Sequence, residues 1–132
     1  MPDMQDALVR RLIADDAVSN IASDRLDWVN VSQDTPRPYV RLQTISDPRP
    51  ITLEGEQEFR ETRVQADCFA DDYASARALA YAIIEAMRPG GTHFGIVFGR
   101  TTAEGPRDLG EDTSEGFVHR ASVDLLVWHS AS

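Results

Sequence analysis

Apolar side chains recur at helical spacing near the start of the chain. Asp3 is suited to an N-cap position, and two pairs of apolar residues four positions apart follow it: Leu8 with Leu12 and Val9 with Ile13. This spacing predicts an N-terminal helix with Arg10 and Arg11 on its solvent side. Residues 17–21 are expected to add one short helical turn.

A longer helix is predicted over residues 72–87, with Asp71 or Asp72 as its cap. Its apolar stripe alternates between spacings of three and four residues: Tyr73, Ala76, Ala80, Ile83 and Met87. The sequence Arg88-Pro89-Gly90-Gly91 ends it, because proline cannot continue a helix and glycine accepts the left-handed cap.

Alternation of apolar and polar residues predicts strands elsewhere. The clearest is at residues 59–69, where Val64, Ala66 and Cys68 alternate with polar side chains. Further strands are expected at residues 26–31, 39–45, 93–98 and 117–129. The order of elements predicts an α+β fold, with an antiparallel (mixed) sheet, two main helices packed on one face and long projecting loops. The length fits a single domain over residues 1–132.

Two acidic segments separate these elements. Residues 46–58 hold four acidic residues and one Arg, and their alternation at Ile51 and Leu53 predicts that the flanking strands extend into a projecting arm. Residues 99–116 hold five acidic residues and two Arg, and are expected to have no structure of their own. Charged segments of this length are either solvated loops or functional, and here the functional alternative is a role in assembly.

The composition narrows the possible chemistry. The chain has 22 acidic and 13 basic residues, all of the latter Arg, and a net charge of −9. The lack of Lys excludes Schiff-base chemistry and a Lys-dependent phosphate loop, and the acidic balance opposes a grip on a nucleic-acid backbone. The N-terminus has no signal-peptide pattern, and no apolar run approaches the ~20 residues of a membrane span. A cytoplasmic site of synthesis and no membrane partner are expected.

The sequence contains no catalytic or metal-binding motif. The three His residues and Cys68 lie at no spacing known for nucleophilic catalysis or zinc binding, and acidic pairs such as Asp71-Asp72 lack the alternating ligands of a calcium loop. Cys68 is expected to be a buried structural thiol, because alternation turns it away from Asp67. These observations predict no enzyme, no cofactor and no metal.

Several segments, taken in order, resemble those of one protein family. They are Asp16-Ala17-Val18 with Ile21 and Asp24-Arg25-Leu26, then Pro36-Arg37-Pro38-Tyr39-Val40, then the strand from Arg63 to Ala70, then Ala76-Arg77-Ala78-Leu79-Ala80. In this order the chain resembles, over its whole length, the small tail-completion or tail-terminator proteins of long-tailed bacteriophages, prophages and gene transfer agents.

The resemblance implies a virion protein of the tail and neck that is assembled in the host cytoplasm. Such a protein caps the tail tube as a hexameric ring, joins it to neck or head-completion proteins, and meets DNA only as passing cargo. No catalysis is implied, so the expected site is a surface for neighbouring subunits and the tube. We assign that surface to nine residues of the acidic segments: Ile51, Leu53, Glu54, Glu56, Arg100, Arg107, Leu109, Glu111 and Asp112. Both segments are expected to become ordered on assembly.

Two other functions are compatible with the same residues. One is that of another neck component, such as a head-completion or adaptor protein. The other is that of a monomeric ligand-binding α+β domain, which requires a concave pocket. In addition, Arg41, Arg60, Arg63 and Arg120 alternate outward on strands expected to pair, so an Arg-lined sheet face is either solvated or a surface for acidic loops of a neighbour.

Overall fold

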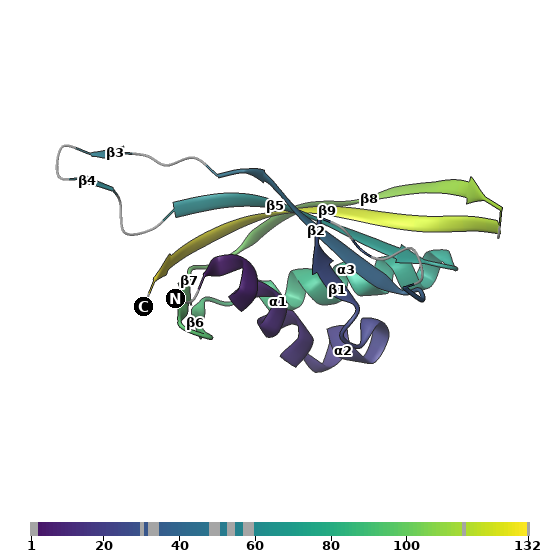
Figure 1. Ribbon diagram of the computed structural model, residues 1–132, viewed down its shortest axis with the longest axis horizontal. Coiled ribbons are helices and arrows are strands. Elements are labelled where there is room, and N and C mark those ends of the chain that lie inside the picture. Colours follow the sequence, from purple (N-terminus) through teal and green to yellow (C-terminus); the bar gives the residue numbers. More distant parts are fainter. Residues whose placement is uncertain are drawn as a thin grey trace.

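The structure is a computed structural model that describes residues 3–29, 31, 35–47, 51–52, 55–56, 60–114 and 116–131. Its helices are α1 (Met4–Ala14), α2 (Asp16–Ala22) and α3 (Tyr73–Met87). All three lie on one face of a seven-stranded sheet, and no described element covers the opposite face (Figure 1). The predicted α+β class, with the main helices on one face, is confirmed.

Aspartates begin all three helices, each by accepting a backbone N–H three residues further on. Asp3 accepts from Asp6 at 2.7 Å, and Asp72 accepts from Ser75 at 3.2 Å. Asp15 ends α1 and also caps α2, where its side chain accepts from Val18 at 3.1 Å. Each bond satisfies a donor that the helix itself leaves unpaired. The N-caps predicted at Asp3 and at Asp72 are confirmed.

The sheet is mixed, and its longest strand lies inside it. The strands run in the order β1 (Leu26–Trp28), β2 (Tyr39–Ser46), β5 (Arg60–Ala70), β9 (Gly116–Ala131), β7 (Ile96–Phe98) and β6 (Gly91–His93), and β8 (Thr102–Thr113) also pairs with β9. The β1–β2 pair is parallel, and the other pairs are antiparallel. β9 is therefore bordered by β5 on one side and by β7 and β8 on the other.

The composition of the acidic segment 99–116 predicted that it has no structure of its own. This prediction is wrong, because residues 102–113 form the strand β8. This strand pairs with β9 from Thr102 opposite Leu126 to Thr113 opposite Gly116. An edge strand is held by backbone hydrogen bonds and does not need an apolar face. Its amino-acid composition can therefore resemble that of a loop. One bulge interrupts the pairing at Gly105, where a Cβ would lie 2.9 Å from the Ser122 carbonyl oxygen.

At the ends of the sheet, the strand predicted at residues 93–98 is corrected, and the arm predicted at residues 46–58 is present. Residues 93–98 do not form one strand: β6 and β7 make a hairpin whose turn holds Phe94 and Gly95, both at positive φ. In the segment 46–58, β3 (Ile51–Thr52) pairs with β4 (Gly55–Glu56), and this pair lies beyond the ends of β2 and β5 as the predicted arm (Figure 1).

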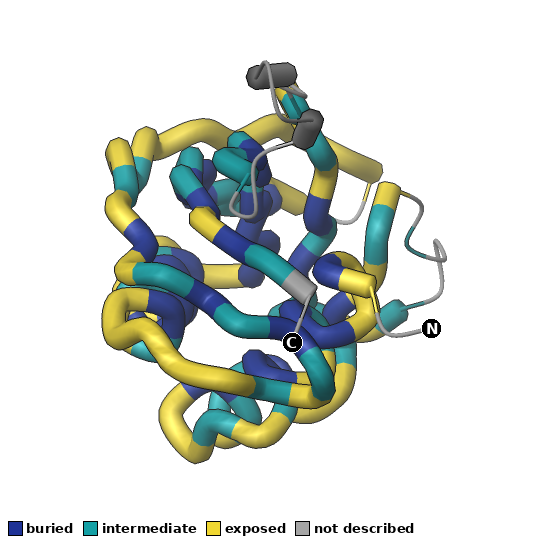
Figure 2. The backbone as a smooth tube through the Cα atoms, turned by 90° about the vertical axis from the view of Figure 1, so that its left-hand side faces the viewer, coloured by how far each residue is buried: buried dark blue, intermediate teal, exposed yellow. Residues whose placement is uncertain are grey.

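The core fills the space between the helices and the sheet. Buried and more exposed positions follow one another along the strands (Figure 2). The buried apolar side chains of the strands and of the helices form one cluster. Fully buried apolar side chains on the helix side of the long strands include Val40, Leu42, Val64, Ala66, Cys68, Val123, Leu125 and Val127. They pack against Leu8, Leu12, Leu79, Ile83 and Met87 of the helices. Burial of such a side chain contributes roughly 1.5–3 kcal/mol, so this layer holds the fold together.

Candidate interaction surface

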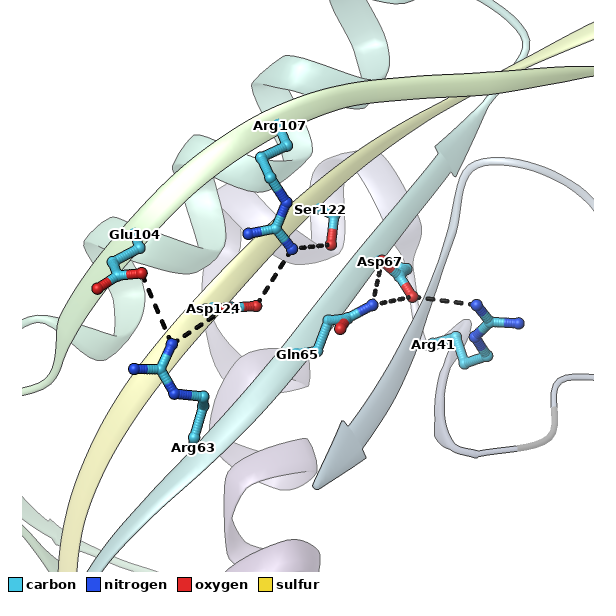
Figure 3. A network of polar contacts seen from close by, with 8 residues as sticks. All are labelled: Arg41, Arg63, Gln65, Asp67, Glu104, Arg107, Ser122 and Asp124. Carbon is cyan, nitrogen blue, oxygen red and sulfur yellow. Dashed lines mark hydrogen bonds and ion pairs between the residues drawn. The ribbon is translucent and has the colours of Figure 1, made fainter. Parts of the chain in front are cut away.

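The sheet face opposite the helices, here called the open face, is built from charged side chains that fix one another. On it, the Asp67 side chain is fully buried and lies 3.0 Å from Arg41 Nη2. Gln65 Nε2 donates to both carboxylate oxygens of Asp67, at 3.1 and 3.0 Å (Figure 3). A carboxylate excluded from water in this way is stabilised by its hydrogen bonds and its ion pair.

A second cluster on the open face connects β5, β9 and β8. Arg63 Nη1 lies 3.1 Å from Asp124 and 3.6 Å from Glu104. Arg107 Nη2 donates to Ser122 Oγ at 3.2 Å and reaches Asp124 at 3.4 Å (Figure 3). Arg107, one of the predicted interface residues, is therefore held by contacts within its own chain.

Four residues at one end of the open face form what we call the Phe69 patch: Tyr39, Arg41, Phe69 and Arg120. The Tyr39 ring stacks on the Phe69 ring with centroids 4.9 Å apart. The guanidinium carbons of Arg41 and Arg120 lie 5.3 and 5.9 Å from the Phe69 centroid. The Nε atoms of both arginines are buried and have no hydrogen-bond partner. The patch thus holds two cations on one aromatic ring, each with an unused donor.

The predicted Arg-lined face exists in part. Arg41, Arg63 and Arg120 belong to it, but Arg60 does not, because it is paired with His129 in the register and lies with Val64 on the other face of β5. Side chains of a strand alternate, so Arg60 and Arg63, three residues apart, cannot share a face. Arg60 instead lies 3.6 Å from Asp47.

The β8–β9 hairpin continues past the end of β5. The last β5 residue, Ala70, lies opposite His119, whereas the hairpin runs on to Thr113 opposite Gly116. Two predicted interface residues, Glu111 and Asp112, are exposed on this part of the hairpin, and Leu109, exposed opposite Arg120, lies just before it. Gly110 permits the close packing there, since a Cβ would lie 2.6 Å from the Phe117 ring.

Contacts to α3 hold the hairpin against the body of the protein. Asp108 on β8 accepts from Arg77 Nη1 at 3.0 Å and from the Tyr73 hydroxyl at 3.2 Å. Tyr73, expected in the buried stripe of α3, is therefore half exposed at the helix start. The hairpin end is a supported extension of the sheet.

The other predicted interface residues lie away from the hairpin end. Arg100 lies in the connection between β7 and β8, Ile51 lies in β3 and Glu56 lies in β4. Leu53 and Glu54 fall outside the described residues. The seven of these nine residues that the structure describes thus form no single cluster within one chain.

Sequence reasoning misplaced Arg11, which is buried rather than solvent-facing. Its Nη2 donates to the carbonyl oxygens of Ala86 and Pro89 at 3.0 and 2.6 Å, near the C-terminal end of α3. Burial lowers the pKa of this guanidinium. A hollow of about 370 Å³ beside it is also lined by His93. The clue in the sequence was its position four residues after Ala7 and three after Leu8, on the arc of buried helix positions.

Comparison with known proteins identifies the family. A family model described as tail completion protein gp17 matches residues 6–130. The chain belongs to this family. The predicted resemblance is therefore confirmed, and the chain is a structural protein of the virion tail that assembles with other virion proteins.

Solved structures show the same fold for this tail completion protein. A chain from the virion of a native gene transfer agent particle aligns with a TM-score of 0.68 at 16% identity, covering 97% of this chain and 93% of that one. A second solved structure aligns with a TM-score of 0.52 at 14% identity, covering 98% of this chain and 97% of its own. No curated protein matches the chain.

Cys68 has the surroundings of a structural thiol in this tail completion protein. Cys68 is buried, and burial followed by the charge of Asp67 raises the pKa of its thiol, as expected for a structural cysteine. Among the described residues, no group of three or more His, Cys, Asp or Glu side chains is placed to hold a metal ion. No helix in the described part of the chain is long and apolar enough to cross a membrane.

Proposed function

We propose that this chain closes the end of a tail tube as a hexameric ring and joins the tail to the neck or head. Membership of the tail completion family carries the proposal. Under it the nine residues of the acidic segments, Ile51, Leu53, Glu54, Glu56, Arg100, Arg107, Leu109, Glu111 and Asp112, belong to surfaces for neighbouring subunits and the tube.

The shape of the chain supports a ring subunit. A closed ring needs two different surfaces on each subunit, so that one surface meets the other on the next copy. The β3–β4 pair and the β8–β9 hairpin extend from opposite ends of the sheet (Figure 1). The open face between them is a layer of oriented charges that no described element covers.

The charge of the chain supports a channel through which DNA passes without binding. A net charge of −9 repels a phosphate backbone, and most of the described open-face arginines are engaged by carboxylates. The proposed partners are other copies of this chain, the tube protein and a neck or head-completion protein. We propose no catalytic step and no cofactor.

One part of the assembly hypothesis changes with the structure. Residues 99–116 were expected to become ordered only on assembly, yet residues 102–113 already pair with β9 in the single chain. The hairpin therefore presents a formed surface to its partner, which lowers the entropic cost of association.

Electron microscopy tests the proposal directly. Particles produced without this chain should have tubes of uneven length that do not join capsids, and added purified chain should appear as a ring at one tube end. Joined particles of normal length made without the chain would contradict the proposal. A ring found at the capsid vertex and absent from isolated tubes would favour a head-completion or adaptor role instead.

A further inference from the structure

The arginines of the open face differ in how fully the chain itself pairs them. Arg63 and Arg107 both have carboxylate partners, and Arg41 has Asp67. Arg120, by contrast, forms no ion pair with any described residue and rests only on the Phe69 ring. With its buried Nε–H also unpartnered, Arg120 is the arginine of this face that lacks an ion pair among the residues that the structure describes. An unpaired buried donor favours an external acceptor.

The surroundings of Arg120 leave room for such an acceptor. A hollow of about 80 Å³ at the edge of the Phe69 patch is lined by Phe69, Gly110, Glu111, Val118 and Arg120. Glu111, opposite Val118, lies on the same face as Arg120, but these two described residues form no ion pair with each other. Phe69 and Tyr39 stack beneath the arginines, so both guanidinium groups are held in place before any partner arrives. Fixed cations beside a small open hollow match a carboxylate, which accepts paired N–H bonds from Arg.

The same chain carries carboxylates without cation partners at its hairpin end. Glu111 and Asp112 are exposed there, and neither forms an ion pair with a described residue. Asp112 lies opposite Phe117, whereas Arg120 lies opposite Leu109, so the two side chains are on different faces of the hairpin. Asp112 therefore cannot reach Arg120 of its own chain.

We propose that the Phe69 patch of one subunit binds the acidic hairpin end of a second copy of this chain, with Asp112 next to Arg120. This inference rests on the proposed ring, because it names one contact between neighbouring subunits. The patch, built from β2, β5 and β9, and the hairpin end are different surfaces of opposite charge. Their pairing is head-to-tail, and a head-to-tail contact repeats from subunit to subunit until the ring closes.

Charge reversal in separate chains tests this contact. Arg120→Glu makes the patch negative, and Asp112→Arg makes the hairpin end positive. Each variant alone then places like charges together at every contact, and self-association should weaken about 30-fold or more. In an equimolar mixture, alternating subunits restore an opposite pair at every contact, so assemblies should return. Sedimentation velocity and native mass spectrometry measure the assemblies, with the purified chain alone and with tubes.

Matched variants control for charge and folding. Arg10→Glu and Asp24→Arg make the same charge changes at exposed sites on the helix side and should assemble like the original chain. Arg120→Gln removes the cation without adding a negative charge and should show the same defect in smaller degree. Circular dichroism of each variant checks its fold, and recovery in the mixture requires that both variants are folded.

Each outcome decides a separate question. If the original chain assembles and both reversed variants assemble equally well, the patch proposal is wrong and the ring proposal stands. If both variants lose assembly but the mixture does not recover, these two surfaces do not meet. If the original chain stays monomeric at millimolar concentration, with and without tubes, both proposals fail.

Discussion

The two faces of the sheet are stabilised by different interactions, although the same strands form both faces. Toward the helices, Val64, Val123 and Leu125 are fully buried in an apolar layer. On the open face, Asp67 is equally buried but is held by directed bonds from Arg41 and Gln65. The apolar layer gains stability from excluded water, which does not depend on direction. The charged layer gains orientation, and with it the ability to distinguish partners.

The largest expected effect is on the helix side. Leu125→Ala removes a fully buried side chain from the core and should lower the free energy of unfolding by about 2–5 kcal/mol. Urea unfolding monitored by circular dichroism measures the change. Leu126→Ala, one residue further on β9 and on the open face, is the matched control and should cost clearly less. Equal losses of unfolding free energy in the two variants would contradict the proposed difference between the two faces of the sheet.

The next effect concerns the buried carboxylate of the open face. Asp67→Ala leaves Arg41 and Gln65 without their acceptor and should cost about 1–3 kcal/mol of unfolding free energy. The double variant with Arg41→Ala should lose less than the sum of the two single variants, because the pair is then removed together. If the losses of unfolding free energy in the two single variants add up to the loss in the double variant, in the same urea titrations, Asp67 and Arg41 do not stabilise each other.

A smaller effect is expected at the partly exposed cluster. Arg63→Ala removes contacts to Asp124 and Glu104, but its side chain is 30% exposed, so the expected cost is below about 1 kcal/mol. Salt should reduce this cost further, since it screens exposed charges. Thermal unfolding at low and high ionic strength checks both points, and a loss as large as that of Leu125→Ala would contradict them.

The smallest expected effect is a pH dependence of stability that arises from His93. Burial, followed by the charge of Arg11, lowers the pKa of His93 below its ordinary 6.5. The unfolded chain therefore binds a proton at higher pH than the folded chain does, and stability should fall as the pH decreases from about 6.5. In His93→Gln this part of the acid-dependent loss should disappear. Urea titrations of both proteins at neutral and mildly acidic pH measure the difference, and parallel curves would contradict the assignment.

Local signals made the helices and the strands β2, β5 and β9 predictable from the sequence. Asp3 and Asp72 act on backbone groups three residues away, and the alternation from Val64 to Cys68 reports a face of a single strand. Such signals need no knowledge of distant contacts. The apolar face of β9 was predictable for the same reason.

The features that were missed depend on distant partners. β8 forms because β9 offers it a free edge, and nothing in residues 102–113 themselves records that edge. Arg11 is buried because carbonyl oxygens of Ala86 and Pro89, 75 and 78 residues away, accept its N–H groups. The Phe69 patch likewise joins side chains from β2, β5 and β9. The candidate surface could be assigned to segments from the sequence, but not to a face.

The continuity of β9 has a mechanical consequence for the tail end. β9 is paired with β5 at eleven consecutive positions, from Arg60 opposite His129 to Ala70 opposite His119, and the hairpin extends from the same strand. A pull on the hairpin along its axis would load these backbone bonds in shear, all at once, instead of peeling them apart one by one. A subunit anchored through that hairpin would thus resist tension along the strand far better than tension across it.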